Sequence, residues 1–173
     1  LFLLLSGLQP SWDGEVYLHG QLIHPQERVA LRQQVALVLQ NSNYQLFTPS
    51  VEDEIAFGLK NMGLREEALH NRLEELLTRY NLAELRHKPP HELSEGQKKW
   101  VALVAVLATD PEVLILDEPT AALDALYTER VLDLLEQLHL AGKTIIISTH
   151  DMELASRFAD RVLLMEAGKL ICD

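Results

Sequence analysis

Three short apolar segments of this chain are each followed directly by polar side chains that can do acid–base or metal chemistry. These pairs of segment and side chain are Val35–Leu39 with Gln40, Val113–Leu116 with Asp117 and Glu118, and Thr144–Ser148 with Thr149 and His150. A carboxylate after a strand can hold Mg²⁺ beside a polyphosphate, a second carboxylate can activate water, and a histidine can hydrogen-bond the phosphate or that water. The pattern predicts a phosphoryl-transfer site.

The elements around these side chains must bring them together. The continuous apolar runs predict strands that are buried on both faces, and helices are predicted over Ser94–Ala108, Thr128–Leu140 and Met152–Phe158. This alternation predicts a doubly wound α/β fold, whose ligands bind at the carboxyl ends of the parallel strands. One at a time, such a glutamine, carboxylate or histidine is equally well a loop or capping residue, so the prediction depends on their convergence.

Further elements follow from local patterns. A helix is predicted at Leu1–Leu8, a half-buried strand at Glu15–His19, an apolar strand at Val162–Met165, and a helical stripe in Leu64–Tyr80 that ends before Pro89-Pro90. Ser50 is a predicted N-cap with Asp53 three residues later. Three features are predicted to be structural only. They are a solvated helix start at Glu52–Glu54, a core stripe of Leu132, Leu135 and Leu138, and a minor basic pair at Lys98-Lys99.

Composition excludes several classes of protein. The 173 residues carry 15 Lys+Arg and 26 Asp+Glu, a formal net charge of −11, which argues against a general nucleic-acid binder. Cys172 is the single cysteine, so an intrachain disulfide and a thiolate metal cluster are excluded. The longest apolar runs fall well short of the roughly 20 residues of a membrane-spanning helix. One folded domain is expected.

Four motifs, in this order along the chain, resemble those of the ATP-binding-cassette (ABC) ATPases. They are Leu93-Ser-Glu-Gly-Gln97, Leu114-Ile-Leu-Asp-Glu-Pro-Thr120, Ala122-Leu-Asp124 and Ser148-Thr-His150, preceded by Gln40. The resemblance covers essentially residues 1–173 and implies a P-loop NTPase-like α/β fold. It also implies that about 48–108 form a helical signature subdomain inserted within the α/β core of a single partial domain.

The resemblance implies ATP and Mg²⁺ as cofactors and a role for each matching residue. Asp117 resembles the Walker B aspartate that holds Mg²⁺, Glu118 the catalytic glutamate, and His150 the switch histidine. Gln40 resembles the Q-loop glutamine, which reaches the metal or the water. Contacts to nucleotide across a head-to-tail dimer are implied for the signature and D-loop residues, here Ser94, Gly96, Gln97 and Asp124.

A narrower resemblance lies between the Q-loop and the signature. The segments 40–47, 51–58 and 89–94 look like the ATPases of energy-coupling-factor and cobalt/nickel importers. This likeness implies a second ABC ATPase subunit, a transmembrane coupling subunit and a substrate-binding membrane subunit as partners, with no nucleic acid. It also implies uptake of a metal ion or vitamin, and a peripheral location on the cytoplasmic face of the cell membrane.

The chain departs from the family pattern in three places. The 173 residues contain no G-x-x-x-x-G-K-[ST] phosphate loop, so that loop and the strand before it are expected upstream of residue 1. Glu95 stands where glycine is common and is expected to face solvent, and Trp100 replaces a basic residue and is expected to pack. Two alternatives remain: a degenerate, non-hydrolysing module that docks or donates a signature, and an ABC-type ATPase of chromosome maintenance, which the absent coiled coil disfavours.

Overall fold

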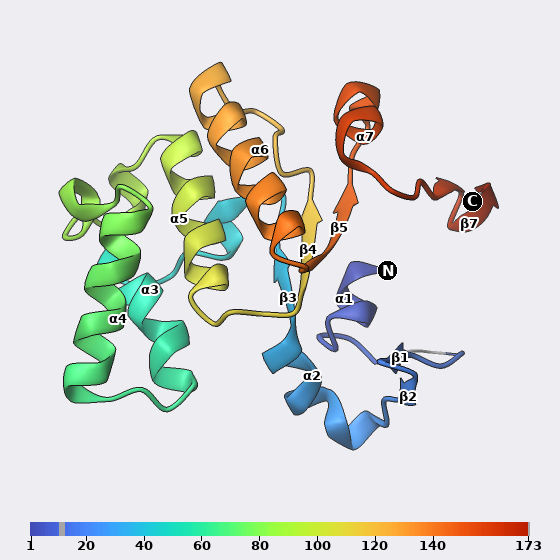
Figure 1. Cartoon of the computed structure of the whole chain (residues 1–173), viewed down its shortest axis with the longest axis horizontal. Helices are drawn as coiled ribbons and strands as arrows, with labels where there is room; N and C mark the ends of the chain where they lie inside the picture. The colour runs from blue at the N-terminus through green and yellow to red at the C-terminus, as the bar shows by residue number, and fades with distance from the viewer. Residues whose placement is uncertain (11–12, 173) are drawn as a thin grey trace.

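The computed structural model describes residues 1–10 and 13–172, and its centre is a parallel sheet of three strands in those residues. The strands β3 (Val35–Val38), β4 (Val113–Asp117) and β5 (Thr144–Ser148) lie in the order β3-β4-β5. Val38 pairs with Leu116, and Asp117 with Ser148. The strands point the same way, so their carboxyl ends share one edge (Figure 1). The three strands predicted from the apolar runs are therefore confirmed.

Helices cover both faces of this sheet because its side chains alternate between them. Leu114 and Leu116 of β4 belong to the larger core, together with residues of α5 (Glu95–Leu107) and α6 (Ala125–Leu140). Ile115, which points to the other face, packs with Leu31 of α2 (Arg28–Gln34) and with Phe2 of α1 (Phe2–Leu5). Burial on both sides is the physical reason that these strands read as uninterrupted apolar runs.

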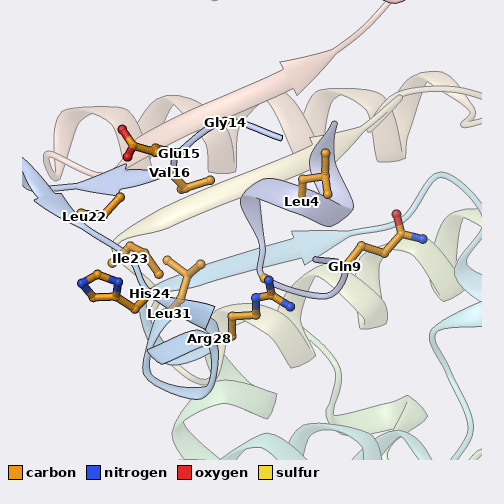
Figure 2. A pocket seen from close by; sticks show the side chains of 11 residues that line it. Leu4, Gln9, Gly14, Glu15, Val16, Leu22, Ile23, His24, Arg28 and Leu31 are labelled. Atoms are coloured by element: carbon orange, nitrogen blue, oxygen red, sulfur yellow. The ribbon is translucent and has the colours of Figure 1, made fainter. Parts of the chain in front are cut away.

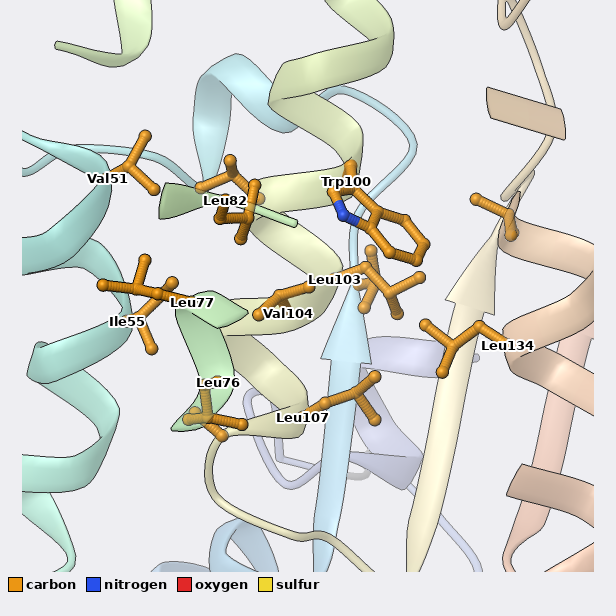
Figure 3. Close-up of a cluster of buried hydrophobic side chains, with 14 of the residues drawn as sticks. Val51, Ile55, Leu76, Leu77, Leu82, Trp100, Leu103, Val104, Leu107 and Leu134 are labelled. Atoms are coloured by element: carbon orange, nitrogen blue, oxygen red, sulfur yellow. The ribbon is translucent and has the colours of Figure 1, made fainter. Parts of the chain in front are cut away.

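The larger core continues away from the sheet into a group of packed helices (Figures 1 and 3). Helix α3 (Val51–Asn61) and α4 (Glu66–Arg79) pack on one another, and α3 packs on α5. Short 3₁₀ turns at Ala83–Leu85 and Pro90–Glu92 join α4 to α5. The fully buried side chains of this group include Ile55, Leu76, Leu77, Leu82 and Leu103. The limits 48–108 given above for a subdomain stay a prediction.

Both predicted helix starts are present with their caps. Ser50 Oγ accepts a hydrogen bond from the amide of Asp53 at 3.1 Å. Ser94 Oγ accepts from the amide of Gln97 at 3.2 Å, and Gln97 Oε1 accepts from the amide of Ser94 at 3.0 Å. These reciprocal bonds form a capping box, which satisfies amides that a helix leaves without partners at its first turn.

The ends of the chain differ from the prediction. The predicted strand 15–19 is present in part as β1 (Tyr17–Leu18), which forms a short hairpin with β2 (Gln21–Leu22). At the other end, β6 (Leu164–Glu166) pairs antiparallel with β7 (Lys169–Cys172), outside the parallel sheet. Helix α1 is shorter than predicted. Three elements were not predicted: helix α2, the 3₁₀ turn before it at Pro25–Glu27, and the 3₁₀ turn at Ser42–Tyr44. Local alternation identifies a strand but does not identify its partner.

Two structural expectations are corrected by the packing. In α6, Leu135 of the predicted stripe is buried and the half-buried Leu138 packs against the core, but Val131 and Leu134 are buried where Leu132 was predicted. Glu54 is 5% exposed rather than solvated. Its Oε2 accepts hydrogen bonds from the amides of Phe47 and Thr48 at 3.1 and 3.0 Å and from Thr48 Oγ1 at 2.7 Å. Glu54 therefore organises the loop before α3.

The remaining helix, α7 (Met152–Phe158), has the predicted limits and begins at the cap Asp151. Helix α6 ends as predicted, with Gly142 at φ +83° just beyond its last turn. Within residues 1–10 and 13–172, none of the helices combines the length and the apolar character that crossing a bilayer requires.

Candidate functional site

The predicted acidic pair lies at the carboxyl ends of β4 and β5, as the parallel register requires. Ser148, the last residue of β5, is opposite Asp117 and donates its hydroxyl hydrogen bond to Asp117 Oδ1. The amide of Glu118 donates to the carbonyl of Ser148 at 3.0 Å. Both carboxylates are half-buried and are held by a rigid strand end. Ser148 was missed as a site residue, although its register with Asp117 is the signal that could have found it.

Glu118 and His150 are in direct contact. His150 Nδ1 lies 2.7 Å from Glu118 Oε1, and the amide of His150 donates to the same oxygen at 3.2 Å. The Glu118 side chain is 18% exposed and that of His150 is 85% exposed. The hydrogen bond that His150 donates to Glu118, followed by the negative charge of that carboxylate, raises the pKa of His150 above 6.5. The Glu118 carboxylate is therefore held by the backbone amide of His150, and it can be reached from the surface on the side where the exposed His150 ring lies.

Gln40 follows β3 at the third strand end, and it is exposed. It lines an open pocket of about 480 Å³ together with the segment Asn41–Tyr44, Glu95, Lys99 and the segment Ala121–Leu123. The loop after Gln40 is fastened by a second glutamine. Gln45 Oε1 accepts from the amide of Leu39 at 3.1 Å, and Gln45 Nε2 donates to the carbonyl of Ala102 at 3.2 Å. The predicted loop therefore begins at the common edge and is held against α5.

The signature residues lie at the first turn of α5, where Ser94 and Gln97 bond to each other. Gly96 is buried, and a Cβ atom there would lie 2.6 Å from Tyr127 Cδ2 on α6. Asp124 is the N-cap of α6 and accepts from the amide of Tyr127 at 2.8 Å. Ser94 and Asp124 thus each cap a helix, and Gly96 allows the two helices to approach closely.

The two departures in the signature have the expected surroundings. The Glu95 side chain is 62% exposed and forms an ion pair with Lys98 Nζ at 2.7 Å. Trp100 is 7% exposed, its Nε1 donates to the carbonyl of Tyr80 at 2.9 Å, and the two rings meet edge to face. Glu95 is therefore a surface residue of the first turn, and Trp100 packs α5 against the end of α4.

Lys99, the second residue of the minor basic pair, is buried. It is 5% exposed, and its Nζ donates to the backbone carbonyl of Glu118 at 2.7 Å. Burial lowers the pKa of Lys99, while the charges of Asp117 and Glu118 act in the opposite direction. The Lys98 side chain, 12% exposed, turns instead to Glu95, so the packing around α5 gives the two adjacent lysines different partners.

The donor set fits the predicted metal. The carboxylate of Asp117 and the hydroxyl of Ser148, which are hydrogen-bonded to each other, are hard oxygen ligands of the kind that Mg²⁺ takes, whereas Gln40 lines a pocket whose lining includes neither of them. A different cavity, of about 190 Å³, lies between α1, the β1–β2 hairpin and α2, where Leu4, Ile23 and Leu31 line it (Figure 2). It contains none of the predicted site residues. The strand edge is therefore the candidate site.

Comparison with known proteins agrees with this geometry. A family model described as ABC transporter matches residues 1–121. The energy-coupling factor transporter ATP-binding protein EcfA of Methanocaldococcus jannaschii is 43% identical over 173 residues, which are 99% of this chain and 62% of that protein. EcfA of Methanococcus maripaludis is 41% identical over 98% of this chain and 62% of its own length. The chain thus spans less than two thirds of these relatives.

Solved structures agree on the fold. CbiO1 of Clostridium perfringens, described as part of the ABC transporter complex CbiONQ, superposes with a TM-score of 0.85 at 37% identity over 99% of this chain and 69% of that one. The ATP-binding cassette MJ0796, a dimer bound to ADP and Pi, superposes with a TM-score of 0.84 at 27% identity over 98% of this chain and 76% of that one. The predicted P-loop NTPase-like α/β fold is confirmed, and the chain belongs to the ABC transporter family.

Proposed function

We propose that the protein containing this chain is the ATP-hydrolysing subunit of an importer of the energy-coupling-factor type. The observation that carries the proposal is the contact at the strand edge, where Glu118 Oε1 lies 2.7 Å from His150 Nδ1 next to the half-buried carboxylate of Asp117. Relatives named EcfA, at about 40% identity, support the same function. Coupling ATP hydrolysis to the uptake of a metal ion or vitamin is the finer part of the proposal.

Each side chain has a defined task in this proposal. Asp117 holds Mg²⁺, and when bound, the metal neutralises charge that develops on the phosphates. Glu118 accepts a proton from the attacking water, because its carboxylate is anchored at a strand end and reachable from the surface. His150, held by Glu118, donates to the phosphate or orients the water. Gln40 reaches the same end of the sheet from the loop after β3 and completes the oxygen donors.

A second subunit completes the site. In a head-to-tail dimer, Ser94, Gly96 and Gln97 of one subunit meet the nucleotide of the other, and Asp124 lies at the interface. The first turn of α5 supports this assignment, since the amides and the helix dipole at an N-terminus favour phosphate. The capping box already orders that turn in a single subunit.

The phosphate cradle is proposed to come from chain outside these residues. In the described part, β5 is an outer strand of the sheet, and β6 and β7 pair only with each other, with Leu164 and Leu170 each 56% exposed. A further parallel strand beside β5 would pair with the unpaired side of β5. It would also deliver a G-x-x-x-x-G-K-[ST] loop to the carboxyl end of the sheet, where Asp117 lies.

A membrane partner is proposed to dock near the loop that follows Gln40. Tyr44, Phe47 and Phe57 are 83, 67 and 46% exposed, and the rings of Phe47 and Phe57 stack edge to face at 5.0 Å. Exposed aromatic side chains gathered in this way are typical of protein interfaces. This docking would place the subunit peripherally on the cytoplasmic face of the membrane, with a transmembrane coupling subunit and a substrate-binding membrane subunit as partners.

The experiment is ATP binding and turnover by the full-length protein, assembled with its membrane partners, in its original form and as Glu118→Gln. The original protein is expected to hydrolyse ATP, and the variant to bind ATP while losing at least about 100-fold in kcat, because the water loses its base. Full turnover in the variant would contradict the role of Glu118. Failure of the original full-length protein to bind or hydrolyse ATP would favour the alternative, a degenerate module that donates a signature to an intact subunit.

A further inference from the structure

Lys99 is an ammonium group buried beside the proposed base. It lies on α5, five residues after the cap Ser94, and only 5% of it is exposed. The group that it reaches is a neutral backbone carbonyl, that of Glu118, at 2.7 Å. Burying a charge on a neutral partner is costly, and the nearby charges of Asp117 and Glu118 offset that cost only in part. Stability alone is therefore a poor explanation for a lysine at this position.

The carbonyl that Lys99 holds belongs to a residue with an unusual backbone conformation. Glu118 has φ +47°, in the left-handed region that side chains other than glycine rarely adopt. Such a conformation persists only where the surroundings hold it, and it recurs at functional sites. The amide of Glu118 is held by the carbonyl of Ser148 at 3.0 Å, and its carbonyl accepts from Lys99 Nζ and, at 3.2 Å, from the amide of Ala121. Of these three hydrogen bonds to the Glu118 backbone, the one from Lys99 is made by a side chain, and the other two are made by backbone groups.

The same face of α5 also holds the loop that begins with Gln40. Ala102 is three residues after Lys99, so both lie on one face of the helix, and the Ala102 carbonyl accepts from Gln45 Nε2 at 3.2 Å. Helix α5 thus bonds directly to Glu118 after β4, and it bonds to Gln45 in the loop after β3, whose side chain also holds the amide of Leu39. Its first turn carries the signature residues, so the segment that meets nucleotide is directly linked to the base.

We infer that Lys99 is a positioning residue that sets the orientation of Glu118 through the bond from its ammonium group to the Glu118 carbonyl. This inference rests on the proposed function, because it gives Lys99 a task only if Glu118 acts on water. Lys99 does not touch the carboxylate that reacts. It acts by fixing the peptide plane from which that carboxylate extends toward His150.

The test measures kcat and KM for ATP in the full-length protein with its partner subunits. Lys99→Met is expected to lower kcat about 10- to 100-fold, as expected for a lost charged hydrogen bond that matters in the transition state, with KM within about twofold of the original. Lys99→Arg is expected to recover most of that kcat, because it keeps a charged donor. The matched control is Lys98→Met, whose lysine pairs with Glu95 and not with Glu118, and which is expected to keep its kcat.

The possible outcomes separate this inference from the proposed function. Turnover by the original protein with an undiminished kcat in Lys99→Met overturns the inference alone, as does a rise in KM without a fall in kcat. Absence of turnover in the original protein overturns the proposed function and, with it, the inference. If Lys99→Met does not fold, Lys99→Gln is used instead. The glutamine side chain is neutral and too short to reach the Glu118 carbonyl, so this variant is expected to lose kcat to the same extent.

Discussion

Replacement of Gly96 by alanine separates a packing role of this glycine from a nucleotide contact. An added Cβ would lie 2.6 Å from Tyr127 Cδ2 and 2.9 Å from Tyr127 Cγ. Carbon atoms in contact are normally about 3.5–4.0 Å apart, so the ring or the helix must move by about 1 Å. The Tyr127 backbone is held at the capped start of α6, and the Arg130 guanidinium lies over its ring, 5.2 Å from the centroid. Overpacking of this kind costs about 1–3 kcal/mol.

The assay is urea unfolding of four proteins: the original, Gly96→Ala, Tyr127→Ala and the double variant. With the tyrosine ring present, Gly96→Ala is expected to lower the free energy of unfolding by about 2 kcal/mol. Without the ring, the same change is expected to be neutral or to stabilise by up to about 1 kcal/mol, since alanine is the better helix former. The coupling between the two positions should therefore be at least about 1 kcal/mol.

Equal effects of Gly96→Ala in the two backgrounds would refute the steric explanation. In that case Gly96 would not be needed for the close approach of α5 to α6. Contact with nucleotide would then be the remaining reason for a glycine at this position. Thermal melting gives a second measure, because 1 kcal/mol corresponds to roughly 2–4 °C for a chain of this size.

Three further predictions concern other parts of the structure. Glu118→Gln is expected to return the pKa of His150 toward 6.5, because the Glu118 carboxylate raises it; NMR titration of the ring protons checks this, and an unchanged pKa contradicts it. The stabilisation from this pair is full below pH 6.5 and is lost as the pH rises through the higher folded-state pKa, a loss that should be absent in Glu118→Gln. Glu54→Ala leaves two loop amides without their acceptor and is expected to lower the free energy of unfolding in urea by about 3 kcal/mol. The control is Glu67→Ala, on the exposed side of α4, which should change that free energy very little. Similar values for the two variants would refute the role of Glu54. Trp100→Phe removes the donor to the Tyr80 carbonyl and is expected to cost about 1 kcal/mol, measured in the same way, and a neutral result would show that ring packing alone matters there.

Sequence patterns were most successful where one local cause dominates. The strands β3, β4 and β5 were predicted because burial on both faces requires unbroken apolar runs. The starts of α3 and α5 were predicted because serine caps are local hydrogen bonds. The convergence of Asp117, Glu118 and His150 followed from the rule that parallel strands end at one edge.

Patterns were least successful where distant contacts decide. The strand predicted at 162–165 follows α7 in a succession of strands and helices that is typical of a parallel sheet, but in the described residues β6 pairs antiparallel with β7, three residues further along the chain. Glu54 reads as a solvated helix start because carboxylates favour the first turn, yet the loop at Phe47 and Thr48 folds over it and supplies its donors. In the predicted stripe of α6, Leu135 is buried and Leu138 packs against the core, but Val131 and Leu134 are buried in place of Leu132, because apolar side chains at adjacent positions make the stripe ambiguous.

The amino-acid sequence by itself determined the fold class, the order of the motifs and the edge of the sheet at which they meet, because each depends on spacing along the chain. Only the tertiary structure decided which of two adjacent lysines is buried. Lys98 and Lys99 are alike in composition and in local pattern, but they are 100° apart around α5, so one reaches Glu95 at the surface and the other reaches the carbonyl of Glu118. The environment of a charged side chain is set by what packs against its helix face, and no window of local sequence contains that information.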